Sequence, residues 1–295
     1  MTKTIKTISH ATVAMVAAAA VLLTSTAFAA PDPEGMPEKA LSVIPENAIE
    51  KAPGLYALGE TYDVDSDSMV EGYMIVHPRT AHAKPSGKGK PGGDTSSGSP
   101  TASCYGFISN GAKWKTYENW EVDPTNLDGL DHQAILSILG NGIEKWEDAA
   151  DGKLDGKLAA IMGSGSINTS GNVIADTAST DGRNEVQFAP LADSNTIAVT
   201  IVWGHFGGAP RWRDIVEWDQ VFNTNYAWDI SASGTPNTMD FENIATHELG
   251  HAMGLADLYD SSCSAMTMYG YGDYAETKAR TLEDGDINGM SALYR

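Results

Sequence analysis

The segment His247-Glu248-Leu249-Gly250-His251-Ala252-Met253-Gly254-Leu255-Ala256-Asp257 is the most informative part of this sequence. Histidines four residues apart on a helix share one face, with Cβ atoms about 5–6 Å apart, so both imidazoles can bind one Zn²⁺. Glu248 can reach a water on the open side of that metal. Gly254 lets the helix end and turn, because glycine tolerates positive φ, and the turn can bring Asp257 back as a third ligand. The alternative, ordinary surface or core histidines, is the weaker interpretation.

The N-terminus has the pattern of an export signal. Lys3 and Lys6 precede an apolar run over residues 13–23, and Ala27-Phe28-Ala29 follows as a small-x-small cleavage pattern. We therefore expect a signal peptide over residues 1–29 and a secreted, extracellular mature protein. The run is short for a membrane span, which needs about 20 residues, although an uncleaved anchor is the alternative. No membrane partner is expected after signal cleavage.

The chain is strongly acidic. Its formal net charge is −20, and removal of Lys3 and Lys6 with the leader would bring it to −22. Such a charge repels nucleic acid and anionic membranes, so neither is an expected partner. The charge favours solubility and identifies no substrate.

Cys104 and Cys263 are the two cysteines of the sequence. In an oxidising compartment they are expected to form one disulfide, with two free thiols as the alternative. The bridge would close a loop of about 160 residues, which the chain-entropy model values at up to about 5 kcal/mol.

Composition divides the chain into four parts. After the leader, residues 30–81 form a short acidic pro-segment or appendage with a predicted hairpin over 54–61 and 70–77. We hypothesise that it is a removable inhibitor. Residues 82–103 are rich in Gly, Ser, Pro and Lys and are predicted to be a flexible linker. Residues 104–295 are long enough for one α/β (α+β) domain.

Periodicity predicts the elements of that domain. Strands are expected over residues 112–117, 184–188, 196–203 and 215–222, and a helix near 131–150. The helix that carries both histidines is expected to start at Asp240 as N-cap and to end at Gly254. A last helix is expected over 282–294, with Thr281 and Asp284 in a capping-box-like arrangement.

The sequence resembles a known family. Residues 247–257 look like the metzincin signature of metallopeptidases, in an Asp-ended form similar to snapalysin. Residues 264–270 resemble the Met-turn, with Met268 matching best, Met266 as rival and ordinary core filling as the alternative for either. Residues 215–228 and 281–294 are similar to matrixin stretches. The resemblance covers about 113–295 and implies a twisted mixed sheet, a zinc-binding active-site helix and a C-terminal helix.

Two departures from matrixins stand out. No Pro-Arg-Cys-Gly motif precedes the domain, so a cysteine-switch latency mechanism is not supported. The histidine-rich loop that binds structural zinc in animal matrixins is also not evident, and His205 is isolated. We expect His205 to be a strand-end or loop residue.

The resemblance implies a zinc-dependent endopeptidase that acts on protein or peptide substrates. His247, His251 and Asp257 would hold one catalytic Zn²⁺, and Glu248 would be the general base. A solvated loop carboxylate is the alternative for Asp257, and nearby Asp260 is its competitor with a spacing that does not match. Cleavage preference is expected to depend on the loop at 270–280 and on an edge strand near 196–203.

Other readings of the sequence stay open. Matrixin-like domains often bind structural Ca²⁺, and the loop acids Asp176, Asp181 and Asp193 are candidates, with plain solvated acids as the default. The chain could instead be an exported non-catalytic zinc-containing binding module, or a metal-dependent hydrolase of another substrate class. No oligomeric state is predicted.

Overall fold

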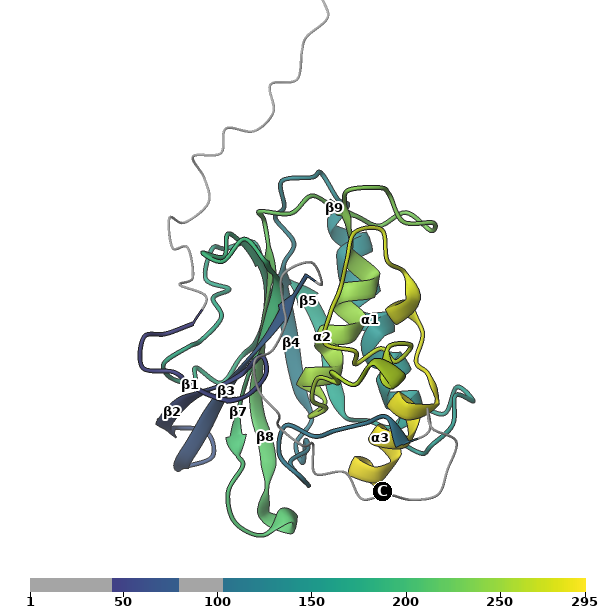
Figure 1. Ribbon diagram of the computed structural model, residues 1–295. Coiled ribbons are helices and arrows are strands. Elements are labelled where there is room, and N and C mark those ends of the chain that lie inside the picture. The colour runs from purple at the N-terminus through teal and green to yellow at the C-terminus, as the bar shows by residue number, and fades with distance from the viewer. Residues whose placement is uncertain (1–43, 80–102) are drawn as a thin grey trace, which may run out of the picture. The chain divides into compact units, whose positions relative to one another are not determined.

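The fold is a mixed β-sheet with helices against one face (Figure 1). The structure is a computed structural model that describes residues 44–79 and 103–295. Eight strands form the sheet in the order β1-β2-β3-β7-β8-β6-β4-β5. Its strands are β1 Ile49–Ala52, β2 Leu55–Asp63, β3 Ser68–Pro78, β4 Glu118–Asp123, β5 Met162–Ile167, β6 Asn184–Ala189, β7 Thr196–His205 and β8 Asp214–Asn223. The helices are α1 His132–Ala149, α2 Phe241–Ala252 and α3 Asp284–Tyr294, and β9 Trp228–Asp229 and β10 Met239–Asp240 form a separate short pair.

The central strands are buried on both faces. Strand side chains alternate between the two faces, so one strand can serve two cores. In β8, Trp218 and Phe222 pack with the core beneath the helices, whereas Val221 packs with the core on the opposite face. In β7, Val202 belongs to the first core and Trp203 to the second. This double burial explains why the two strands read as nearly continuous apolar runs.

Helix α1 packs closely against α2. The predicted helix over residues 131–150 is confirmed, and Asp131 caps it by accepting a hydrogen bond from Ala134 N. The Trp146 indole donates to Thr246 O of α2 at 2.8 Å. A Cβ placed on Gly142 would lie 2.6 Å from Leu249 Cδ1. The glycine that weakens the helix signal in the sequence therefore lets α1 approach α2 closely.

The strand predictions succeed in part. The predicted strands at 184–188, 196–203 and 215–222 correspond to β6, β7 and β8. The strand predicted at 112–117 is wrong, since only Trp114 makes a β-bridge there, to Ile215. Strands β4 and β5 were not predicted; β5 has the sequence MGSGSI, whose glycines give no strand signal.

Residues 49–79 join the main sheet. The predicted hairpin is present as β2 and β3, and β1 adds a third antiparallel strand, so we call residues 49–79 the N-terminal meander. Strand β3 continues the sheet by pairing antiparallel with β7 from Glu71 to Pro78. The expectation that residues 196–203 form an edge strand is therefore wrong, because β3 covers that edge.

The C-terminal helix begins two residues later than predicted. Helix α3 starts at Asp284, and the backbone N–H of Glu283 donates to the Asp286 carboxylate at 2.9 Å. The predicted pair of Thr281 and Asp284 is thus not the cap. Among the described residues, no helix has the length and apolarity needed to cross a membrane. The predicted signal peptide (1–29) and almost all of the linker (82–103) lie outside the described residues.

Candidate metal centre

Helix α2 places the two histidines and Glu248 in a buried site. Asp240 caps the helix by accepting from Asn243 N at 2.8 Å, as predicted. Leu249 and Ala252 pack into the core between the helices and the sheet. His247 and His251 are at most 1 % exposed, and Glu248 is fully buried. Three ionisable side chains in one buried site require compensating partners, because burial of polar groups without partners is costly.

The turn after α2 brings Asp257 to both histidines. Gly254 has φ +103°, and a Cβ there would lie 2.8 Å from Ala112 O, so both conformation and space require glycine. His247 Nε2 lies 3.1 Å from His251 Nε2 and 3.2 Å from Asp257 Oδ1. His251 Nε2 lies 3.4 Å from the same oxygen. Ligand atoms on one tetrahedral zinc, each bonded at about 2.0–2.1 Å, are separated by about 3.4 Å, so this triangle fits the ion.

Outer hydrogen bonds orient each prospective ligand. His247 Nδ1 lies 2.7 Å from Thr267 O, and His251 Nδ1 lies 2.9 Å from Leu255 O. A carbonyl can only accept, so each Nδ1 carries the proton and each Nε2 presents a lone pair to the centre. Asp257 Oδ2 accepts from the Tyr259 hydroxyl at 2.9 Å.

Asp257 Oδ1 is a buried acceptor that faces only acceptors. Within the described chain it has no hydrogen-bond partner, and the Asp257 side chain is only 4 % exposed to solvent. Burial alone would raise the pKa of Asp257, but the adjacent imidazoles of His251 and His247 outweigh it and hold the pKa well below its usual value. An ionised carboxylate oxygen between two imidazole lone pairs needs a cation, so the residues fit a zinc ion.

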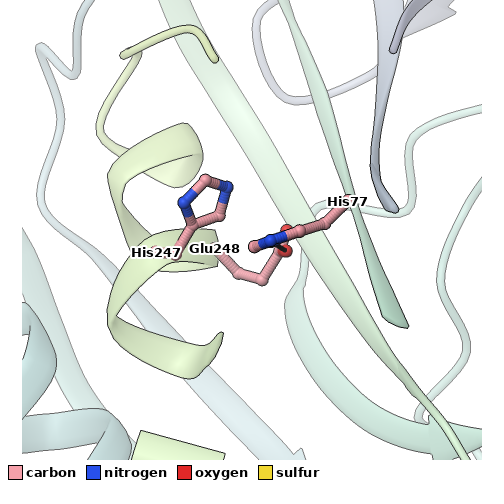
Figure 2. A group of neighbouring side chains, drawn as sticks. All are labelled: His77, His247 and Glu248. Carbon is pink, nitrogen blue, oxygen red and sulfur yellow. Dashed lines mark hydrogen bonds and ion pairs between the residues drawn. The ribbon is translucent and has the colours of Figure 1, made fainter. Parts of the chain in front are cut away.

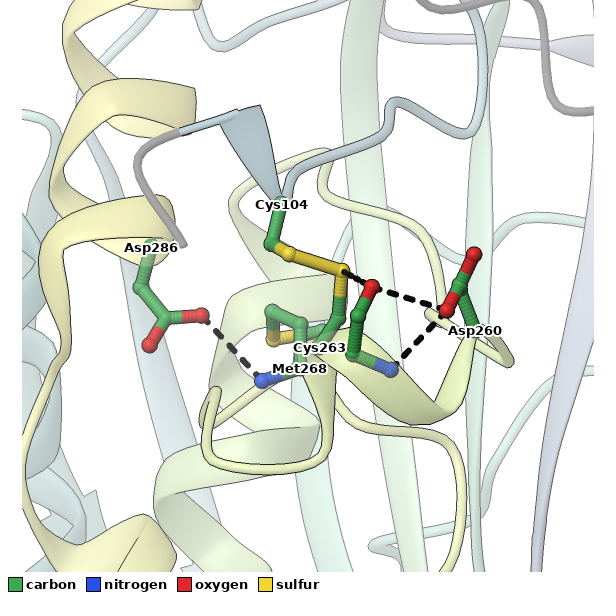
Figure 3. The surroundings of a disulfide bond; sticks show 6 residues. Cys104, Asp260, Cys263, Met268 and Asp286 are labelled. Carbon is green, nitrogen blue, oxygen red and sulfur yellow. Dashed lines mark hydrogen bonds between the residues drawn. A yellow bond between two sulfur atoms is a disulfide. The ribbon is translucent and has the colours of Figure 1, made fainter. Parts of the chain in front are cut away.

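The two methionines of the predicted Met-turn have different places. Met268 lies beneath α2, where a Cβ on Gly250 would be 2.2 Å from its sulfur. Met266 instead packs with Cys104 and Cys263, which form a disulfide (Figure 3). The structure thus places Met268 rather than Met266 next to α2, the helix that carries both histidines.

Asp286 of α3 accepts hydrogen bonds from the backbone of the Met-turn. Its carboxylate accepts from Thr267 N at 2.9 Å and from Met268 N at 3.2 Å, and Figure 3 shows the second of these hydrogen bonds. Thr267 O accepts the hydrogen bond from His247 Nδ1. Asp286 therefore supports a prospective zinc ligand indirectly, by fixing the backbone of Thr267. Sequence reasoning missed Asp286, because this acid lies 19 residues beyond Thr267 along the chain.

Glu248 makes contacts with both of its carboxylate oxygens. Oε1 lies 3.0 Å from His77 Nδ1, and Oε2 accepts from the Thr200 hydroxyl at 2.6 Å. Figure 2 shows His77 reaching from β3 to Glu248 and His247. Burial alone would raise the pKa of Glu248, but the hydrogen bond and charge of His77 lower it. Sequence reasoning missed His77, which lies 171 residues away along the chain.

The other polar residues singled out in the sequence lie apart from the metal centre. Asp260 is exposed and caps a short 3₁₀ turn through Ser262 N at 2.9 Å (Figure 3), so it is not with the histidines. His205 ends β7, as expected, and its Nδ1 lies 2.6 Å from Asp214 Oδ1. Asp193 accepts from Asn195 N within a turn.

A second group of acids lies on the sheet face opposite the helices. Carboxylate oxygens of Asp176, Glu217 and Asp219 lie close enough together to share a cation. Glu217 and Asp219 alternate with Trp218, which faces the helices. Burial, reinforced by the neighbouring acids, raises the pKa of Asp176 to about 6 and that of Glu217 to about 8, and raises that of Asp219 well above its usual value. We call these three residues the acid cluster. Asp181 lies beside it, where its backbone N–H donates to Glu217.

The C-terminal part of the chain is similar to a known protein family, although no curated protein matches the chain. The family model for the matrixins, a family of zinc-dependent metallopeptidases, matches residues 178–295. The matched residues include the prospective ligands, Glu248, Met268 and α3. The match and the geometry agree, and they support a matrixin-like metzincin over residues 178–295.

Proposed function

We propose that this protein is a secreted endopeptidase that uses one zinc ion and Glu248 to hydrolyse peptide bonds. The match of residues 178–295 to a metallopeptidase family model supports peptide-bond hydrolysis. The single observation that carries the zinc proposal is the convergence of His247 Nε2, His251 Nε2 and Asp257 Oδ1 within 3.1–3.4 Å. Those three residues would hold the metal.

The chain's own residues would then manage protons and orientation. When bound, zinc supplies Lewis acidity, which lowers the pKa of water toward about 7 and polarises a carbonyl. Glu248 would accept a proton at its carboxylate and deliver it to the leaving amine. Thr200 would fix the orientation of Glu248 through the hydrogen bond to Oε2. The carbonyls of Thr267 and Leu255 keep both imidazoles in the tautomer that a metal needs.

The test compares two glutamates of α2. Glu248→Gln should retain zinc and lose hydrolysis of casein or a fluorogenic peptide by at least about 10²-fold, since general acid–base catalysis contributes about 10²–10⁴-fold. Glu242→Gln is the matched control, because Glu242 lies on the same helix in an ion pair with Lys145. Zinc content and rate are measured in the intact chain and in the chain nicked within residues 80–102, because β3 adjoins Glu248. Full activity of Glu248→Gln would refute the mechanism.

The main alternative is a non-catalytic zinc-containing binding module. Structural zinc sites usually have four protein ligands, often cysteines. Here both cysteines are joined to each other in a disulfide. Release of peptides from unfolded protein, stopped by a zinc chelator and restored by zinc, supports the peptidase; zinc binding without hydrolysis in any form of the chain favours the module.

Export and calcium belong to the proposal as separate claims. Secretion rests on the pattern of residues 1–29, and it predicts that protein from the medium starts near residue 30 by N-terminal sequencing. Structural calcium is supported by the carboxylate-rich loops of the domain, and it predicts that added Ca²⁺ raises the melting temperature of the zinc-loaded chain. A melting temperature that does not respond to Ca²⁺ would remove calcium from the proposal.

A further inference from the structure

The end of β3 lies in a slot between β7 and the segment after the Met-turn. On one side, β3 pairs antiparallel with β7 up to Pro78. On the other side, Gly272 N donates to Pro78 O at 3.3 Å, and Arg79 makes a parallel bridge with Gly272. An extended strand enclosed from both sides next to a catalytic centre has the geometry of a bound peptide, because extended peptides bind to sheet edges through backbone hydrogen bonds.

His77 brings this strand into contact with the catalytic residues. Its side chain is 2 % exposed, and its ring centroid lies 4.0 Å from that of His247. Its Nδ1 is hydrogen-bonded to Glu248 Oε1 at 3.0 Å (Figure 2). A Cβ on Gly272 would lie 3.0 Å from His77 Nε2, so the slot is shaped around this imidazole.

A second part of the N-terminal meander approaches the metal centre. The turn between β1 and β2 contains Gly54, whose carbonyl accepts from Val76 N at 2.9 Å. Gly54 has φ +73°, and a Cβ there would lie 2.6 Å from the Tyr259 hydroxyl and 3.5 Å from Asp257 Oδ2. The meander thus reaches a prospective zinc ligand as well as the general base.

These contacts exclude a substrate. A peptide in this cleft needs the edge of β7 and a Glu248 oxygen that is free to take a proton. Strand β3 covers the edge of β7 by pairing with it from Glu71 to Pro78. His77 and Thr200 each make a hydrogen bond to one carboxylate oxygen of Glu248. Among described residues, the meander contributes His77, whereas Thr200 belongs to the catalytic part of the sheet.

We propose that the N-terminal meander is an internal occupant of the substrate cleft, in which His77 ties up Glu248, so that the intact chain is a latent enzyme. This inference rests on the proposed function and deepens it. The meander connects to residues 103–295 only through residues 80–102. Hydrolysis of one peptide bond there by a second protease, with one water consumed, leaves the meander bound by non-covalent contacts alone.

The first experiment removes the imidazole in the full chain. His77→Ala should raise the rate of hydrolysis of a fluorogenic peptide at least about tenfold, since a free general base contributes about 10²–10⁴-fold. His132→Ala is the matched control, because His132 is exposed at the start of α1. Zinc content should equal that of the wild type, whereas hydrogen exchange of β7 should rise, because loss of the His77 side chain removes contacts that hold β3 in the cleft. A rate at or below that of His132→Ala, in a zinc-loaded and folded variant, overturns the proposal.

The second experiment does not depend on activity. Brief trypsin treatment is expected to nick the chain after Lys88, because Lys84 and Lys90 each precede a proline and trypsin does not cleave Lys-Pro bonds; the site is verified by mass spectrometry. The nicked protein, with both fragments present, is diluted, and hydrogen exchange of β7 amides is followed. Departure of the meander should lower the protection of residues 196–204 and raise the hydrolysis rate together. Unchanged β7 protection at every dilution overturns the proposal.

The two experiments separate this inference from the proposed function. Equal rates for intact, nicked and His77→Ala proteins would leave the peptidase standing and overturn latency. Lost β7 protection without hydrolysis in any zinc-loaded form would support a releasable meander and refute the peptidase.

Discussion

The metal centre and the acid cluster both bury carboxylates, but their surroundings act on them in opposite directions. At the metal centre the pKa of Asp257 is held well below its usual value by His251 and His247. In the acid cluster, burial and like charges raise the pKa of Glu217 to about 8. The first site is built to keep a carboxylate charged at neutral pH, and the second favours a protonated one.

The difference lies in which groups face the buried oxygens. Asp257 faces two imidazoles and the Tyr259 hydroxyl. Glu217 accepts from the backbone of Asp181 and Gly182 at one oxygen, and within the described chain its other oxygen has no hydrogen-bond partner. A cation is therefore expected to bind the metal centre through ligands that are already oriented.

The largest effect is expected from removal of the carboxylate ligand. Asp257→Ala should weaken zinc binding by on the order of 10²- to 10³-fold, because apparent zinc binding energies of about 10–16 kcal/mol are shared among a few ligands. Asp260→Ala should leave the affinity unchanged, since Asp260 only caps an exposed turn. Competition with a chromogenic chelator measures both. A loss confined to Asp260→Ala would assign the third ligand to that residue.

A smaller effect is expected from loss of the hydroxyl that orients Asp257. Tyr259→Phe removes the hydrogen bond to Asp257 Oδ2, and outer-shell partners are typically worth about 10–100-fold in metal affinity. Tyr271→Phe is the matched control, because the Tyr271 ring packs against the rings of Tyr259 and Tyr269, at centroid distances of 5.2 and 5.6 Å. Equal zinc affinities of the two variants would show that the hydroxyl does not orient the ligand.

The smallest effect is expected from pH at the acid cluster. The folded-state pKa of Glu217, about 8, lies above the ordinary value of 4.5. Between these values the folded chain keeps a proton that the unfolded chain loses, so the free energy of unfolding falls as pH rises from about 5 to 8. Glu217 contributes to this fall through its raised pKa, a value that already includes the two backbone hydrogen bonds that lower it.

Glu217→Gln separates this contribution from the others. Glutamine cannot ionise, so the variant should lose less stability than the wild type between pH 5 and 8 in urea unfolding with a chelator present. Glu60→Gln, an exposed position on β2, serves as control. A fall in stability equally steep in wild type and Glu217→Gln would show that Glu217 is ionised throughout.

Helix α2 could be predicted because its determinants are local. The spacing of His247 and His251, the cap at Asp240 and the turn at Gly254 all act within one helix and its ends. Tertiary partners were not predictable from such spacing. Thr267, Asp286 and His77 come from the Met-turn, α3 and β3, and only the fold brings them to the site.

The sheet was harder to predict than the helices for a related reason. Strands with continuous apolar runs, such as β7, carry a clear signal, whereas the glycines of β5 do not. The order of strands depends on pairing between distant segments, so the position of β3 beside β7 was not visible in the sequence. The acid cluster is likewise assembled from β8 and a loop that lies before β6.

The central claim is that His247, His251 and Asp257 share one zinc ion. Anomalous diffraction at the zinc absorption edge, from crystals of the zinc-loaded chain, tests it most directly. We predict one peak bonded to both Nε2 atoms and to Asp257 Oδ1, each at about 2.0–2.2 Å. A peak held by other residues, or these three side chains separated with no ion between them, would contradict the claim.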